Sequence, residues 1–123
     1  MAHRKRVLLV DKESNGAEAI QALLEAWGHE VTPASTGQEG VRLALQCAPE
    51  IVLVDIGLPD VDGRTVARTI RARVDPPPML VALTNRDCEP GDAELFDAYI
   101  MKSGVDRLRS LLDNPAGPRP RRQ

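Results

Sequence analysis

The stretch that decides the fold is IVLVDIGLPD at residues 51–60. Its first four residues are aliphatic, which predicts a strand buried on both faces, as in a parallel sheet. The strand ends in Asp55, and Gly57 and Pro59 then turn the chain. Open α/β sheets bind their ligands beyond the carboxyl ends of the strands, so we expect Asp55 to belong to a site.

A second run, VLLVD at residues 7–11, repeats the pattern and ends in Asp11. Burying either carboxylate costs free energy unless another group compensates its charge. Two strands that each deliver an acid to one edge of a sheet therefore indicate a functional site. The structural alternatives, in which Asp55 caps a turn and Asp11 caps a helix, stay open at this point.

Strands and helices alternate along the chain. Short apolar runs predict strands at 7–10, 29–34, 51–54, 79–83 and 99–101. Apolar residues at helical spacing lie between them, and Thr36–Glu39 forms a capping box at the start of one helix. The alternation predicts an α/β fold with a five-stranded parallel sheet and helices on both faces. We expect residues 1–113 to form one domain and the Pro/Arg-rich residues 114–123 to be a disordered tail.

The composition excludes several classes of function. A formal net charge of −2 lacks the excess of basic residues that is typical of nucleic-acid-binding domains. No apolar stretch approaches the roughly 18 residues of a membrane span. Cys47 and Cys88 fit no metal-binding spacing, so we expect reduced cysteines of a cytoplasmic protein. His3 and His29 stand alone in the sequence, and we expect both to be solvated.

The predicted strands deliver a chemical set to their carboxyl ends: Asp11, Asp55, Thr84 and Lys102. A carboxylate can act as a nucleophile toward a phosphoryl group. A hydroxyl can bond a phosphoryl oxygen, and an ammonium can neutralise the charge that develops there.

The chain resembles response-regulator receiver domains over residues 6–113, in wording similar to the receivers that accompany hybrid histidine kinases. The segments that carry the resemblance occur in the family's order: VLLVDKE, LLEAWGHEV, PEIVLVDIGLPDVDG, LVALT and DAYIMKSG. The resemblance implies a doubly wound, flavodoxin-like sheet with strand order 2-1-3-4-5. It also implies a signalling module rather than an enzyme, with self-phosphorylation and self-dephosphorylation of Asp55 at most.

The resemblance assigns roles to individual residues. It implies that Asp55 takes a phosphoryl group from a phosphohistidine of a histidine kinase or a histidine phosphotransfer protein. Thr84 and Lys102 would then bind the phosphoryl group. Tyr99 would move with Thr84 and signal to a downstream protein partner, and a homodimer is a further possibility for the family.

The resemblance also implies a magnesium site. Its ligands would be Asp11, Asp55 and the backbone carbonyl of Gly57. The family has a second acid directly after the first, where this chain has Lys12. We expect this exchange to weaken magnesium binding, with the Lys12 ammonium occupying part of the metal's place.

Three further departures concern the phosphoryl-binding end. The family's Lys-Pro pair is replaced by Lys102 and Ser103, so we expect no cis bond there. The segment from Thr84 to Lys102 is about four residues short, roughly one helical turn. We therefore expect a shortened fourth helix and a non-standard output surface. Asn85 replaces the small residue that usually leaves access to the site.

A row of arginines follows the turn through Gly63. Its members are Arg64, Arg68, Arg71 and Arg73. We expect a solvated helix face, with a docking site for an acidic partner as the alternative. Asp60 and Asp62 read as turn residues rather than ligands.

Three other functions compete with a phosphoacceptor. A pseudo-receiver would act as an interaction module that never carries phosphate, and Lys12, Ser103 and the short fourth helix favour it. A phosphatase with an aspartyl nucleophile is disfavoured, because Gly57 occupies the position of its general acid. A nucleotide-binding protein is disfavoured because no glycine-rich loop follows the first strand.

Overall fold

A parallel five-stranded sheet with the order β2-β1-β3-β4-β5 forms the centre of the fold. The computed structural model describes residues 4–12, 14–84, 95–101, 108–109 and 112. All neighbouring strands pair in parallel. The predicted fold class and the strand order implied by the resemblance are therefore confirmed.

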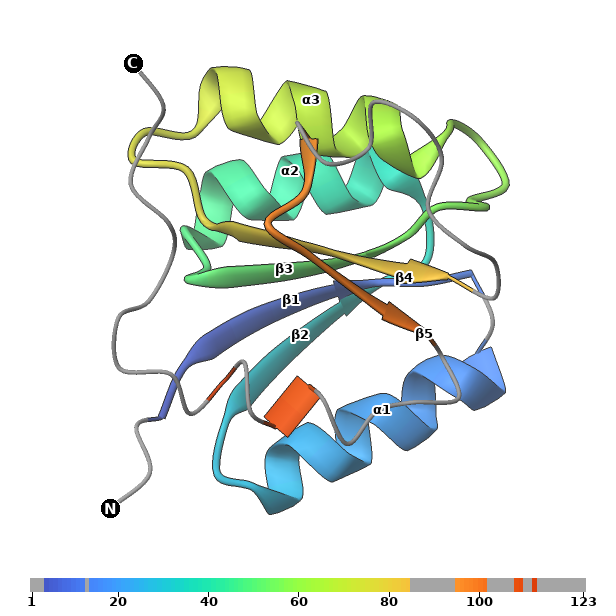
Figure 1. The fold of residues 1–123 in the computed structure, drawn as a ribbon, viewed down its shortest axis with the longest axis vertical. Coiled ribbons are helices and arrows are strands. Elements are labelled where there is room, and N and C mark those ends of the chain that lie inside the picture. The colour runs from blue at the N-terminus through green and yellow to red at the C-terminus, as the bar shows by residue number, and fades with distance from the viewer. Residues whose placement is uncertain (1–3, 13, 85–94, 102–107, 110–111, 113–123) are drawn as a thin grey trace.

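From β1 to β4 the strands and helices alternate as the sequence predicts. The strands are β1 (Arg6–Val10), β2 (Glu30–Ala34), β3 (Ile51–Asp55), β4 (Met79–Thr84) and β5 (Ala98–Met101). The helices are α1 (Ser14–Ala26), α2 (Gly37–Cys47) and α3 (Gly63–Arg73). Figure 1 shows α2 and α3 side by side on one face of the sheet and α1 on the other. No described helix is long and apolar enough to cross a membrane.

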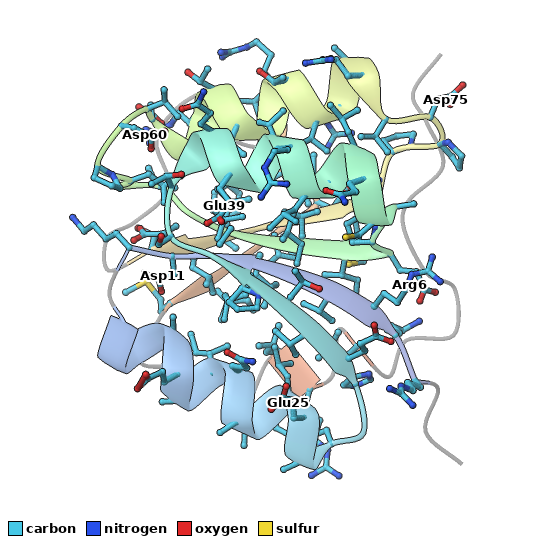
Figure 2. All side chains as sticks on the ribbon, turned by 180° about the vertical axis from the view of Figure 1, so that it is seen from behind. Arg6, Asp11, Glu25, Glu39, Asp60 and Asp75 are labelled. Atoms are coloured by element: carbon cyan, nitrogen blue, oxygen red, sulfur yellow. The ribbon has the colours of Figure 1, made fainter. Side chains whose placement is uncertain are left out.

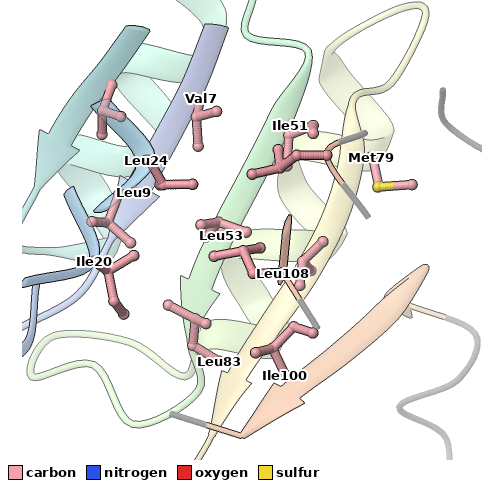
Figure 3. Packing of buried hydrophobic residues seen from close by; sticks show 13 residues of the cluster. Val7, Leu9, Ile20, Leu24, Ile51, Leu53, Met79, Leu83, Ile100 and Leu108 are labelled. Atoms are coloured by element: carbon pink, nitrogen blue, oxygen red, sulfur yellow. The ribbon is translucent and has the colours of Figure 1, made fainter. Parts of the chain in front are cut away.

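Alternating strand residues build two apolar layers, one on each face of the sheet. The layer on the α1 side includes Leu9, Leu53 and Leu83, and the chain returns to it at Leu108 (Figure 3). The layer under α2 and α3 includes Val54 and other small aliphatic residues of the same strands. Strand β3 is buried at every position, as its four aliphatic residues predict.

The capping box at α2 is present with one difference. The Thr36 hydroxyl accepts a hydrogen bond from the Glu39 N–H at 3.1 Å. The Glu39 carboxylate accepts from the N–H of Ser35 at 3.2 Å. In the usual capping box the Glu side chain accepts from the N–H of the N-cap residue itself, which here is Thr36. Glu39 instead accepts from Ser35, one residue before the N-cap.

The prediction that His29 is solvated is wrong. Its side chain is only 4% exposed. The Nδ1 atom accepts a hydrogen bond from the Lys5 N–H at 3.1 Å, just before β1 begins. A buried imidazole needs such a partner, and His29 joins the start of β2 to the chain before β1.

The prediction of a solvated arginine row is wrong at Arg71. Its guanidinium donates two hydrogen bonds to the Leu95 carbonyl, at 2.6 and 3.2 Å. It also lies 3.7 Å from a carboxylate oxygen of Asp97. Asp97 in turn bonds the backbone of Leu80, so Arg71 ties α3 to the start of β5.

Candidate functional site

The register of β1 and β3 brings Asp11 and Asp55 together at the carboxyl edge of the sheet. Val10 pairs with Val54, so the next residue of each strand is an acid. Neighbouring strands lie about 4.8 Å apart. Asp11 is 3% exposed and Asp55 is 5% exposed. Figure 2 shows Asp11 at the opposite end of the sheet from Arg6.

A tight loop between β3 and α3 holds the Asp55 carboxylate. The Gly57 N–H donates to Asp55 Oδ1 at 2.9 Å. The Gly63 N–H closes the loop by donating to the Ile56 carbonyl at 2.9 Å. A Cβ on residue 63 would collide with the Asp55 carbonyl oxygen and lie 2.7 Å from the Ile56 Cα. Only glycine fits this position without displacing the backbone at the site.

The other end of the same loop is fastened to α2 by Asp60. The Asp60 carboxylate accepts hydrogen bonds from the N–H groups of Gly37 at 2.8 Å and Gln38 at 3.0 Å. These backbone donors lower the pKa of Asp60 below its ordinary value, and the bond from Gly37 has the largest effect. Asp62 caps α3 by accepting from the Arg64 N–H at 2.8 Å. Both acids lie in the turn, as predicted, and both cap helices.

The Lys12 ammonium lies near Gly57, two residues after Asp55. An ideal Cβ built on Gly57 would be 3.9 Å from Lys12 Nζ and 3.8 Å from Asp55 Oδ1. The ammonium and the Asp55 carboxylate thus both lie near Gly57. Lys12 also lines a surface pocket with Asp11 and Glu39 beside the end of β1.

Thr84 and Tyr99 lie on the same face of the sheet. Thr84 ends β4, where it pairs with Met101 and is 8% exposed. Tyr99 pairs with Ala82, two residues before Thr84. Because side chains two apart on a strand point to the same side, Tyr99 and Thr84 are neighbours on that face. The Tyr99 ring packs edge-on against Phe96, with centroids 5.6 Å apart.

Some of the predicted site lies outside the described residues. These positions are Lys102, Ser103, Asn85 and the shortened helix before β5. The structure thus brings together Asp11, Lys12, Asp55 and Gly57 at the end of the two central strands, with Thr84 on the adjacent strand β4.

The described residues fit a divalent cation poorly. Magnesium prefers an octahedral set of hard oxygen ligands. Asp11, Asp55 and the Gly57 carbonyl could supply part of that set. In the described ranges, however, no three His, Cys, Asp or Glu side chains are placed to hold a metal ion. The Lys12 ammonium near Gly57 adds positive charge close to one of these predicted ligands.

Two functional positions escaped the sequence analysis. Asp60 looked like a turn residue, yet it bonds a helix 22 and 23 residues away in the sequence. Gly63 looked like a turn glycine, but it is required by contact with the backbone of Asp55. The sequence signal for both was the DVDG segment at residues 60–63, in which acids precede a helix start.

A parallel sheet of this order, with two buried acids at its carboxyl edge, defines a receiver-type α/β fold. Residues 7–106 match the response regulator receiver domain family. The chain belongs to this family of two-component signalling domains, whose members partner with histidine kinases. A receiver domain is a signalling module rather than an enzyme, apart from self-phosphorylation.

Solved structures agree with this assignment. The response regulator TrrA of Thermotoga maritima, in complex with Mg²⁺-BeF, is 28% identical with a TM-score of 0.80. The match covers 86% of this chain and 94% of that one. The BeF3-activated receiver domain of Klebsiella pneumoniae RstA is 26% identical with a TM-score of 0.76. That match covers 87% of this chain and 97% of the RstA domain.

Curated relatives are longer than this chain. The sensor histidine kinase AtsR of Burkholderia thailandensis is 34% identical over 112 residues, which is 85% of this chain and 19% of that protein. The transcriptional regulatory protein AfsQ1 of Streptomyces coelicolor is 30% identical over 104 residues, which is 83% of this chain and 46% of that protein. The chain thus spans less than half the length of either relative.

The Asp60 contacts predict a pH-dependent loss of stability. A carboxylate with a lowered folded-state pKa contributes stability above its ordinary value of 3.8, and this is lost as pH falls through the folded pKa. Asp60→Asn should therefore be less stable than the wild type at pH 7. The difference should shrink by pH 3. Urea unfolding of both proteins across this range measures it, and a difference that stays constant with pH would contradict the assignment.

Proposed function

We propose that the domain accepts a phosphoryl group on Asp55 from a phosphohistidine of a histidine kinase or a phosphotransfer protein. The observation that carries the proposal is the pairing of β1 with β3, which sets Asp55 beside Asp11 at the carboxyl edge of the sheet. The Gly57 N–H fixes one carboxylate oxygen of Asp55 at 2.9 Å, which orients the group. Orientation of a nucleophile is a main source of rate in such transfers.

The transfer is a single displacement at phosphorus. A carboxylate oxygen of Asp55 attacks the phosphorus while the bond from phosphorus to the imidazole nitrogen breaks. The electron pair of the broken bond stays on that nitrogen, and the ring leaves as neutral imidazole because its other nitrogen already carries a proton; Asp55 becomes an acyl phosphate. In this proposal the Thr84 hydroxyl and the Lys102 ammonium bind the transferred oxygens and offset their charge.

Lys12 supplies part of the positive charge that a metal ion would otherwise bring. Two unit charges about 4 Å apart interact by roughly 4 kcal/mol at an effective dielectric of 20. Where the family has a second acid, this chain has Lys12. A divalent ion therefore loses one attraction to a carboxylate and gains a repulsion from the ammonium. Solvent screens both, because Lys12 is exposed. Magnesium binding is therefore weak, and phosphorylation depends little on it.

The phosphorylated site signals through Thr84 and Tyr99. A phosphoryl group adds nearly two negative charges and three acceptor oxygens. Drawing the Thr84 hydroxyl toward it frees space on the face that Tyr99 shares. Tyr99 then shifts from its packing against Phe96 and changes the surface near β5.

A pseudo-receiver is the second candidate. The position of Lys12 Nζ near Gly57, whose N–H binds the Asp55 carboxylate, favours it, since a standing ion pair between Lys12 and Asp55 could imitate the charge state of a modified site. The two candidates differ in one observable: a pseudo-receiver never forms an acyl phosphate on Asp55.

Incubation with acetyl phosphate tests the phosphoacceptor. The wild type should gain the mass of one phosphoryl group, because the Asp55 carboxylate can displace acetate at phosphorus. Asp55→Ala should gain none, and Asp62→Ala, a change in the same loop outside the edge acids, should behave as the wild type. Intact-protein mass spectrometry measures the adduct. An adduct that survives in Asp55→Ala would refute the assignment, and none in the wild type would favour the pseudo-receiver.

Replacing Lys12 with an acid should restore dependence on magnesium. Lys12→Asp should bind Mg²⁺ at least about tenfold more tightly than the wild type, because the local charge becomes more negative by two units. Lys12→Met removes the ammonium without adding an acid, so its affinity for Mg²⁺ should lie between those of the wild type and Lys12→Asp. Isothermal titration with MgCl₂ gives the affinities. Ordinary magnesium binding by the wild type that is lost in Asp55→Ala would contradict the role given to Lys12.

A further inference from the structure

A groove of about 690 Å³ runs between α2 and α3, away from the acids at the edge of the sheet. Leu45 and Val61 line it and are 42% and 39% exposed. Two apolar side chains exposed in one groove make it a candidate interaction surface, although the patch is small. We call this surface the α2–α3 groove; its apolar lining is Val41, Leu45, Val61 and Val66.

One wall of the groove is a continuous face of α2. The lining residues of α2 are at positions 38, 41, 42 and 45, which is the i, i+3, i+4, i+7 spacing of one helix face. These positions span about 10 Å, or two turns. Since α2 and α3 lie side by side, a third helix can pack its apolar ridge between them (Figure 1). Such grooves bind amphipathic helices through three or four anchoring side chains.

The charges at the groove select the partner's chemistry. Arg42 and Arg73 line it on opposite helices. Asp60 also lines it, but its carboxylate accepts from the N–H groups of Gly37 and Gln38, so the positive end of the α2 dipole offsets part of its negative charge. Arg42 is 3.8 Å from Glu39, and its side chain remains 62% exposed. The rim therefore favours a partner with acidic side chains.

We infer that the α2–α3 groove docks an amphipathic helix of a partner protein, with acidic residues flanking its apolar face. The inference goes beyond the phosphoacceptor function and does not require it, because the groove is formed in the unmodified protein. It gives the domain an interaction surface separate from the face that Tyr99 would change.

Two synthetic helices test the inference. They share an apolar face with Leu at i, i+3 and i+7 and differ only in flanking Glu or Lys residues. The Glu helix should bind the full chain at least about fivefold more tightly, as two exposed ion pairs allow. Backbone amide NMR of the unphosphorylated protein should place the shifts in α2, in α3 and at residues 60–61.

Three variants of the chain give the controls. Leu45→Glu should abolish binding of the Glu helix, and Arg73→Glu should reduce or reverse the preference between the two helices. Met101→Glu places the same charge on a side chain that is 41% exposed but lies on β5, and it should bind as the wild type. Circular dichroism checks that each variant is folded.

Several results would overturn the inference. Equal binding of both helices, shifts outside the groove, or no binding of either helix at millimolar concentration would each do so. A dimer of the wild type that Leu45→Glu dissociates in sedimentation velocity would also overturn it, because a second copy would then occupy the groove.

Discussion

The parallel pairing of β3 with β1 is the constraint on which the rest of the structure depends. It aligns Val54 with Val10 and thereby sets two carboxylates side by side at the edge of a buried sheet. Neither acid can be buried there without compensation from backbone donors or nearby cations. The Gly57 N–H provides one such group for Asp55, and its position depends on the loop that follows β3.

That loop connects the acids to the outer layer of the molecule. It is closed by the bond from Gly63 to the Ile56 carbonyl and fastened to α2 by Asp60. One short segment therefore touches the Asp55 carboxylate at one end and forms a wall of the α2–α3 groove at the other. The chemistry at the sheet edge and the shape of the helix surface share the same backbone.

The sequence was sufficient to predict the strands, the order of elements and the two acids, because these follow from apolar runs and from what ends them. It was insufficient where a side chain's partner lies far along the chain. His29 bonds the backbone of Lys5, and Arg71 bonds the carbonyl of Leu95, each 24 residues away. Local patterns predict exposure for both side chains, and only the folded arrangement supplies their partners. For the same reason the position of Lys12 Nζ beside Gly57 could be proposed from the sequence but not located by it.

The central claim is that Asp55 is the phosphoacceptor, and chemical trapping tests it most directly. Phosphoramidate offers the same phosphorus–nitrogen bond as phosphohistidine, and borohydride reduces an aspartyl phosphate to homoserine. Peptide mass mapping after both treatments should find homoserine at residue 55 and at no other position. Homoserine at another acid, or an unchanged Asp55 after complete sequence coverage, would contradict the claim.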